Sequence, residues 1–403
     1  MKRFKELFRL AAVLISCSLT TIMMAQTQQV DTTLNSDIDI SLLTCGPGDA
    51  VYSLYGHTAI RIQNKSIGED IAVNYGIFSF NKSFFILKFI FGLTDYTMAI
   101  APYDAFIESY AEEGRWVTEQ KLNLSDDEKM RILNAISVNY LPENREYRYN
   151  YFYDNCTTRA RNIIADNLNS KAVFPDAEPP ADTFRKSLKL FTSNHPWAQF
   201  GDDLLLGVGA DRTIDRRQWQ FLPENLMDDF AAAYIDDGQQ GKRMLVSETN
   251  EVLTFPDKQG QDLLNTTFTP RNVMVCIALI ILLITVLELL FKRSCLALDF
   301  ILLSVTGIAG LILFVMIFSQ HPTVRLNLQI LLLNPLSLFM AYPVVKSESK
   351  GKPHRYWNFL FYCIILFLIG NTLQNYAEGM NILAMALVIR CWTKLSHKNR
   401  KGA

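Results

Sequence analysis

The chain has 403 residues and a formal net charge of −1 at pH 7, and 49% of its residues are hydrophobic. A balanced charge of this kind excludes binding to nucleic acid through a strongly basic surface. Residues 30–270 have the composition of a water-exposed domain, whereas residues 272–393 are strongly apolar. This division predicts an exported domain joined to a membrane domain.

The N-terminus has the pattern of a secretory signal. The segment Met1-Lys2-Arg3-Phe4-Lys5 is basic, and an apolar run follows from about Leu10 to Ala25. We predict a signal peptide over residues 1–25 that is cleaved near Ala25. Two alternatives stay open, a lipobox with a lipidated Cys17 and an uncleaved anchor. All three place the following domain outside the cytoplasm.

A β-hairpin is predicted early in the exported domain. Alternation over residues 55–62 indicates a strand with His57 and Arg61 on one face, and residues 71–80 indicate the strand that returns beside it. Asn74 would then lie next to His57 and orient its ring. The alternative is that Asn74 is an ordinary polar residue of an edge strand.

Mixed helices and strands follow the hairpin. Residues 84–91 are aromatic and apolar but too short to span a bilayer, so they form either a core element or a lip that enters the membrane surface. Pro102 begins a predicted helix over residues 103–113, and residues 115–124 alternate as a strand. A capping box at residues 125–128 begins a helix that extends to about Asn139.

The run from Tyr149 to Asp154 leads into a helix that begins at Asn155 and Cys156. Asn155 is a favourable N-cap residue, and Cys156 falls in the first turn, where the helix dipole lowers a thiol pKa. A thiol at a helix N-terminus that faces a strand histidine is the arrangement of a papain-like nucleophile. We therefore predict Cys156 as the nucleophile and His57 as its base.

Purely structural interpretations of His57 and Cys156 stay open. His57 has the pattern of an ordinary strand histidine, and Cys156 that of a small buried residue. Cys45 and Cys156 are the two cysteines between the signal and the membrane segments, so they are also candidates for a disulfide in an oxidising compartment.

Five apolar segments make up the last third of the chain, at about residues 273–291, 296–319, 328–345, 356–372 and 380–393. With the preceding domain outside, the inner loops and tail contain most of the lysine and arginine residues, while the outer loops contain Arg325. This distribution obeys the positive-inside rule. We predict a membrane domain over residues 272–403 with about five transmembrane helices and a cytoplasmic C-terminus.

Polar residues of the membrane domain fall into two groups. Glu288 and Asp299 lie near the inner ends of their helices, where we expect them to pair with the lysine and arginine at positions 292 and 293 without a catalytic role. His321, Arg325 and Asn327 lie on the outer side, beside the exported domain. We regard these three as candidates for contact with the substrate.

Several motifs together resemble the Lnb-type bacterial lipoprotein N-acyltransferases. They are Gly46-Pro47-Gly48, Tyr55-Gly56-His57-Thr58-Ala59-Ile60-Arg61, Asn74-Tyr75-Gly76 and Asn155-Cys156-Thr157-Thr158. The resemblance implies an α+β permuted papain-like (NlpC/P60-like) periplasmic domain, in which histidine precedes cysteine, followed by an all-α transmembrane bundle. We assign residues 26–170 to the catalytic domain and, from their sequence pattern, residues 171–271 to a mostly helical periplasmic extension and linker.

The resemblance also implies a reaction and a place in the cell. In the inner membrane, Cys156 would take an acyl chain from a membrane phospholipid as a thioester, and the N-terminal amine of a lipidated cysteine on a lipoprotein would receive it as an amide. His57 would serve as acid and base, and Asn74 or Asn155 would orient groups or stabilise the oxyanion. We expect no cofactor and no metal. The alternatives are a papain-like cell-wall peptidase or amidase and a non-catalytic membrane-tethered module.

Overall fold

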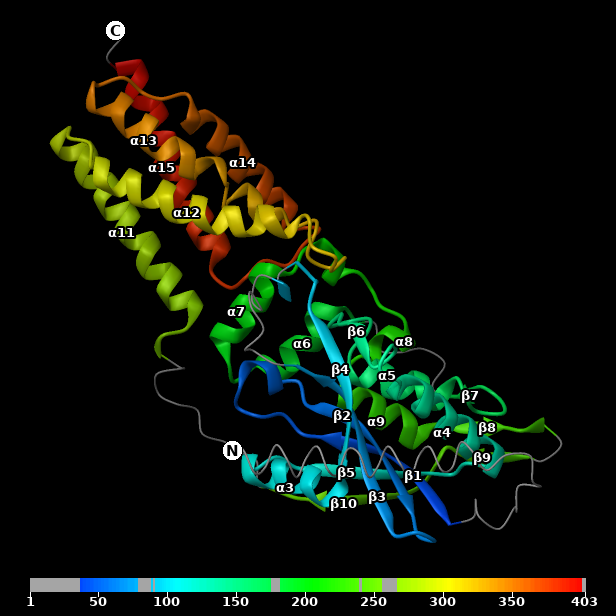
Figure 1. Ribbon diagram of the computed structural model, residues 1–403. Helices are drawn as coiled ribbons and strands as arrows, with labels where there is room; N and C mark the ends of the chain where they lie inside the picture. The colour runs from blue at the N-terminus through cyan, green and yellow to red at the C-terminus, as the bar shows by residue number, and fades with distance from the viewer. Residues whose placement is uncertain are drawn as a thin grey trace.

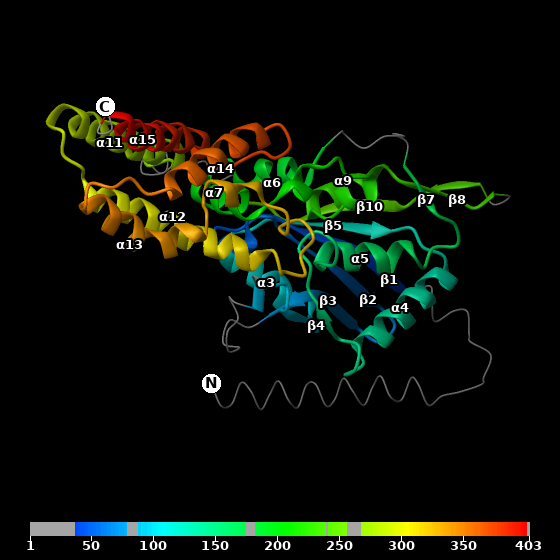
Figure 2. The ribbon, with the colours of Figure 1, turned by 90° about the horizontal axis from the view of Figure 1, so that it is seen from above.

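The computed structural model describes residues 37–78, 88–89, 91–174, 182–238, 241–255 and 267–400, with side chains to residue 396. The predicted signal peptide, including Cys17, lies outside the described residues, as do residues 84–87 and 90 of the aromatic run. A helical bundle and a domain built on a β-sheet lie end to end in the molecule (Figures 1 and 2). This mixed α/β domain followed by a helical region confirms the predicted fold class.

The exported domain is built on a seven-stranded antiparallel sheet with the order β10-β5-β1-β2-β3-β4-β6. The predicted hairpin is formed by β2 and β3, in which Ala59 lies opposite Asn74. On the other side of β2, His57 lies opposite Cys45 of β1. The strands are β1 (Ile38–Cys45), β2 (His57–Asn64), β3 (Glu69–Ile77), β4 (Asp95–Pro102), β5 (Val117–Leu122), β6 (Glu146–Arg148) and β10 (Val246–Leu253).

Helices cover both faces of this sheet because successive strand residues alternate between them. On β2, Ala59 packs in a cluster with residues of α3 (Tyr103–Glu113), and the next residue, Ile60, packs in a cluster with residues of α5 (Cys156–Ala165). The second face also holds α4 (Asp126–Tyr140), whose predicted capping box is formed by Ser125 and Glu128. Helix α5 therefore packs directly on the hairpin that contains His57.

Residues 171–271 contain several helices, as the sequence predicted, but they are not separate from the sheet of the preceding domain. Their strand β10 pairs with β5 and completes the main sheet, and β7 (Ala172–Val173), β8 (Tyr234–Asp236) and β9 (Lys242–Met244) form a second, three-stranded sheet. The open edge of β5 requires a hydrogen-bonding partner, and local sequence patterns do not show which distant segment supplies it. The helices of this part are α6 (Phe184–Thr192), α7 (Pro196–Leu205), α8 (Arg216–Trp219) and α9 (Pro223–Ala232).

The bundle contains a helical segment at each of the five predicted positions. They are α11 (Pro270–Phe291), α12 (Leu296–Met316), η5 (Leu328–Leu331) with α13 (Leu336–Ser349), α14 (Tyr356–Gly370) and α15 (Met380–Arg400). Within the described residues, three segments are long and apolar enough to cross a membrane by length and composition, namely those at 270–291, 296–316 and 328–349. The count of five crossings stays a prediction.

Charged residues inside the bundle pair differently from the prediction. Arg390 of α15 is fully buried and lies 2.9 Å from Glu288 and 2.7 Å from Asp299. Lys394, one turn further along α15, lies 2.9 Å from Glu348. The expected pairing of Glu288 and Asp299 with Lys292 and Arg293 is therefore wrong. The two acids face α15, a neighbour in space that is distant in sequence.

The exported domain is attached to the outer loops of the bundle through backbone hydrogen bonds. The N–H groups of Gly207 and Val208 donate to the carbonyls of Thr323 and Leu326 at 2.8 Å. The Asn327 side chain donates to the carbonyl of Leu204 at 2.8 Å. Helices α6 and α7 thus lie between the sheet and the bundle (Figure 1), and they fix the two parts relative to each other.

Candidate active site

Cys156 is the first residue of α5, as the sequence predicted. The side-chain oxygen of Asn155 accepts a hydrogen bond from the Thr158 N–H at 2.8 Å, and the Thr158 hydroxyl accepts one from the Asn155 N–H at 2.8 Å. This reciprocal cap fixes the start of the helix. The Thr157 and Thr58 hydroxyls lie 3.0 Å apart and join the first turn of α5 to β2. The thiol is therefore held beside the strand that contains His57.

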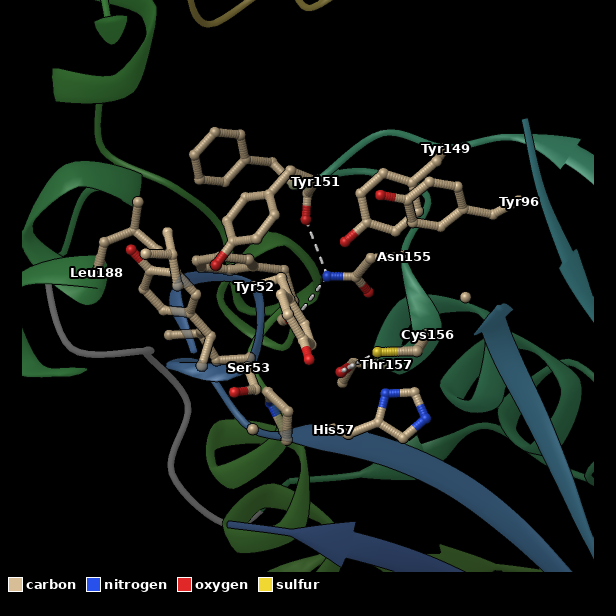
Figure 3. A pocket seen from close by; sticks show the side chains of 18 of the residues that line it. Tyr52, Ser53, His57, Tyr96, Tyr149, Tyr151, Asn155, Cys156, Thr157 and Leu188 are labelled. Atoms are coloured by element: carbon tan, nitrogen blue, oxygen red, sulfur yellow. Dashed lines mark hydrogen bonds between the residues drawn. The ribbon is translucent and has the colours of Figure 1, made fainter. Parts of the chain in front are cut away.

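The His57 ring lies between the thiol and Asn74. Nε2 donates to the Asn74 Oδ1 at 2.6 Å, which leaves Nδ1 to face Cys156, and Figure 3 shows a ring nitrogen directed at the sulfur. Asn74 reaches this position because the β2–β3 register places it opposite Ala59, two residues after His57. The structure thus brings together the three side chains of a papain-like triad, Cys156, His57 and Asn74.

The environment favours the charged forms of both Cys156 and His57. Burial by itself raises the pKa of the Cys156 thiol, but the charge of His57 and hydrogen bonds from His57, the Thr58 backbone and Thr157 lower that pKa to about 7. Burial by itself lowers the pKa of His57, and the Cys156 thiolate and Asn74 more than offset it, so the pKa is raised. This mutual stabilisation is that of a thiolate–imidazolium pair.

Gly76 lies beside Cys156 and His57 in a backbone conformation that favours glycine. Its φ is +90°, and a Cβ at this position would lie 3.7 Å from the Cys156 Cβ and 4.0 Å from the His57 Cε1. Glycine adopts this backbone conformation without the strain that an L side chain would add. The Asn74-Tyr75-Gly76 motif therefore contributes both the partner of His57 and a glycine at positive φ beside the thiol.

The disulfide alternative for Cys156 is wrong in this structure. Cys45 and Cys156 are both free thiols. Cys45 is fully buried in β1, and burial raises the pKa of its thiol to about 12. Cys45 is therefore an inert core residue, and Cys156 is the ionisable thiol of the pair.

Asn155 does not direct its amide towards the thiol. The two N–H groups of its side chain donate to the carbonyls of Tyr151 at 2.8 Å and Phe221 at 2.9 Å. With its oxygen bound to Thr158, the side chain fixes the aromatic run and the helix start in place. A helix start can offer other donors, because first-turn backbone N–H groups have no partner within the helix, although that of Thr158 is bound to Asn155 at 2.8 Å.

Cys156 and His57 open onto a cavity of about 620 Å³. Its walls are contributed by both parts of the molecule, since Met316, His321 and Val324 of the bundle line it together with Cys156 and His57. Tyr96 and Tyr149, with rings stacked 4.0 Å apart, line it near the thiol (Figure 3). The site is therefore incomplete without the bundle.

The three substrate-side candidates of the outer loops separate in the structure. His321 lines the cavity, and burial, opposed by a hydrogen bond with the Phe89 backbone, lowers its pKa. Arg325 and Asn327 do not line it: the Arg325 side chain donates to the Ser319 carbonyl at 2.7 Å, and Asn327 is buried against α7. Of these three residues, His321 is the one that lines the cavity.

The sequence patterns predicted no role for two polar residues of the cavity wall. Tyr55 and Asp202 both line it, and the Tyr55 hydroxyl donates to the Asp202 carboxylate. Asp202 is on α7, whose position depends on the contact with the bundle. Its local pattern, one of two consecutive aspartates in a helix, carries no signal for a site.

The described residues contain no group of three or more histidine, cysteine, aspartate or glutamate side chains arranged to hold a metal ion. A thiolate, an imidazole and backbone N–H groups are sufficient for acyl transfer through a covalent intermediate.

Comparison with known protein families gives one match for each half of the chain. Residues 25–189 match the family described as the Lnb N-terminal periplasmic domain, and residues 262–401 match the Lnb transmembrane domain. Searches of curated proteins and of solved structures return no match. The two matched ranges correspond to the exported domain and the helical bundle, the two structural parts that enclose the cavity.

Proposed function

Because this chain belongs to the Lnb family of lipoprotein-modifying enzymes, with a periplasmic domain attached to the inner membrane, we propose that it is a lipoprotein N-acyltransferase. It moves an acyl chain from a membrane phospholipid to the N-terminal amine of a lipidated cysteine. The acyl chain is held on the way as a thioester of Cys156.

In the first half-reaction, the Cys156 thiolate attacks the carbonyl carbon of a phospholipid ester. The developing oxyanion is stabilised by first-turn N–H groups of α5. The C–O bond to the glycerol oxygen then breaks, and the His57 imidazolium gives its proton to the leaving alkoxide. A thioester and a lysophospholipid result, and His57 is neutral.

In the second half-reaction, the neutral amine of the acceptor attacks the thioester carbonyl. His57 accepts the proton that the nitrogen loses, and the C–S bond breaks to release the thiolate. The amide product leaves with Cys156 and His57 returned to their charged forms. Asn74 supports both steps because its oxygen accepts from Nε2 and directs Nδ1 towards the sulfur.

The shared wall of the cavity is the observation that carries this proposal. The nucleophile lies in a space that is closed in part by Met316, His321 and Val324 of the bundle. Acyl chains are strongly retained by the bilayer, so a nucleophile that acts on them has to reach the membrane side. A cell-wall peptidase acts on soluble peptides and has no need of such a wall.

The experiment uses the full-length protein, a phospholipid with labelled acyl chains and no acceptor. We expect label on the protein that is released by neutral hydroxylamine and absent in Cys156→Ala. Cys276→Ala, which removes an exposed thiol of α11, is the matched control and should label normally.

Adding a lipopeptide with a free N-terminal amine should move the label to the peptide in a form that resists hydroxylamine. Label that appears only as free fatty acid would instead establish a hydrolase. Label that persists in Cys156→Ala would remove Cys156 from the reaction.

A further inference from the structure

The wall of the cavity formed by α7 carries a carboxylate that the proposed reaction does not use. Asp202 lines the cavity that contains Cys156, and its Oδ2 accepts a hydrogen bond from the Tyr55 hydroxyl. No donor to the other carboxylate oxygen is present in the described part of the chain. The carboxylate therefore has one bonded oxygen and one that is available to a ligand.

The charge of Asp202 is not neutralised by a neighbouring base. Arg185 approaches it, but its guanidinium is bound to Asp203 and Asp211 at 2.9 Å. Elsewhere on the cavity wall, Glu113 is already paired with Arg115 at 2.9 Å. Burial raises the pKa of Asp202 to about 6, so the group is mostly ionised at neutral pH. The cations of the cavity wall, Arg115 and His57, are paired with Glu113 and Cys156 and not with Asp202. A partly buried anion that has no paired cation is suited to a cationic ligand.

The surroundings of the carboxylate specify the kind of cation. The rings of Tyr55 and Tyr151 meet edge to face with centroids 5.4 Å apart, and both line the cavity. Aromatic faces attract ammonium groups, and a carboxylate accepts hydrogen bonds from their N–H donors. The Tyr151 hydroxyl is buried and has no hydrogen-bond partner among the described residues. A primary ammonium would interact with both the rings and the carboxylate.

We propose that Asp202, together with Tyr55 and Tyr151, binds the primary ammonium of the donor's headgroup, so that the enzyme selects phosphatidylethanolamine as its acyl donor. This inference rests on the proposed function and specifies its donor. An anionic headgroup such as phosphatidylglycerol has no cation for this site and is repelled by its charge.

The acceptor amine is a poor candidate for the same site. An amine attacks a thioester only in its neutral form, and a carboxylate beside it would stabilise the protonated form. The headgroup ammonium takes no part in the chemistry and keeps its proton throughout. Asp202 also lies at the bundle, since the carbonyl of the next residue, Asp203, accepts from the Gln329 side chain at 2.9 Å. This is the side from which a membrane lipid enters.

The test measures thioester formation by the full-length protein from three donors with identical labelled acyl chains, which differ only in an ethanolamine, choline or glycerol headgroup. We expect the wild type to label fastest from phosphatidylethanolamine, by about tenfold over phosphatidylglycerol, the size expected for a charged hydrogen bond. Phosphatidylcholine should be intermediate because its ammonium has no N–H donor. Asp202→Asn should bring the three rates close together, whereas Asp104→Asn, on the exposed side of α3, should keep the preference.

A second readout does not depend on activity. Cys156→Ala in a detergent with equal amounts of the three lipids should retain phosphatidylethanolamine in native mass spectra, and adding Asp202→Asn should abolish that enrichment. Equal labelling of the wild type from all three donors would overturn the proposal, as would an Asp202→Asn variant that slows all donors equally while remaining folded. If no donor labels the wild type, the proposed acyl transfer itself fails, and lipid retention by Cys156→Ala still decides the headgroup site.

Discussion

Replacing Asn74 by alanine tests whether the geometry around His57 sets the reactivity of the thiol. The substitution removes the acceptor that lies 2.6 Å from Nε2 and leaves Cys156 and His57 unchanged. The hydrogen bond from Nε2 is stronger when the ring is an imidazolium than when it is neutral. Its loss therefore lowers the pKa of His57, and the thiolate that depends on the imidazolium becomes less favourable.

The size of the effect follows from the difference between charged and neutral hydrogen bonds. That difference is roughly 1 to 1.5 kcal/mol, which corresponds to about one pKa unit. The thiol pKa of about 7 should therefore rise to about 8 in Asn74→Ala. His57→Ala removes the imidazolium altogether, so the thiol pKa should rise to its ordinary value of 9.0 or above it.

The assay is the rate of alkylation of the full-length protein against pH, followed by the mass of the fragment that contains Cys156. Only the thiolate reacts, so the rate rises with pH through the thiol pKa. At pH 7 the alkylation of Asn74→Ala should be about fivefold slower than that of the wild type.

Gln63→Ala is the matched control, because Gln63 lies on β2 away from the thiol and hydrogen-bonds to Asp70 at 3.2 Å. Its profile should coincide with that of the wild type. An Asn74→Ala profile that also coincides with the wild type would refute the role assigned to Asn74.

Two glycine substitutions test how the site is assembled. Gly207→Ala would place a Cβ 2.2 Å from the Leu326 carbonyl oxygen, so it should separate the exported domain from the bundle and abolish thioester formation. Gly201→Ala, whose Cβ would have no atom within 4 Å, should retain thioester formation. A fully active Gly207→Ala would show that the contact between the two parts is dispensable. Gly76→Ala should lower the unfolding free energy by about 1 to 2 kcal/mol and slow labelling of Cys156, as measured by thermal melts and thioester formation. Gly68→Ala, also at positive φ but with open space around it, should cost similar stability and leave labelling unchanged, and equal labelling of both variants would contradict the role of Gly76.

The dependence of the cavity on both parts of the chain has a functional consequence. Met316, His321 and Val324 close a space whose nucleophile is carried by the exported domain. In the proposed reaction, a thioester in such a space would be shielded from water, which would favour transfer to an amine over hydrolysis. The described residues of the aromatic run agree with a position at this junction, because the Phe89 and His321 rings lie 6.2 Å apart and Gln320 donates to the Phe91 carbonyl at 2.9 Å.

Local patterns in the sequence were sufficient to predict the elements that carry Cys156 and His57. The N-cap of Asn155, the first-turn position of Cys156 and the hairpin alternation around His57 each depend on neighbours within a few residues. Helix caps and strand alternation are short-range properties, so they survive in the folded chain as predicted. The apolar segments of the bundle were predictable for the same reason, since each is a continuous run.

Tertiary structure alone decided which of these elements face one another. It placed β10 beside β5, paired Arg390 with Glu288 and Asp299, and brought Asp202 and His321 to the cavity of Cys156. It also turned Asn327 towards α7 and committed the Asn155 amide to two carbonyls. A side chain finds its partner through the packing of distant segments, and a hydrogen bond between residues more than a hundred positions apart leaves no mark on the local pattern of either.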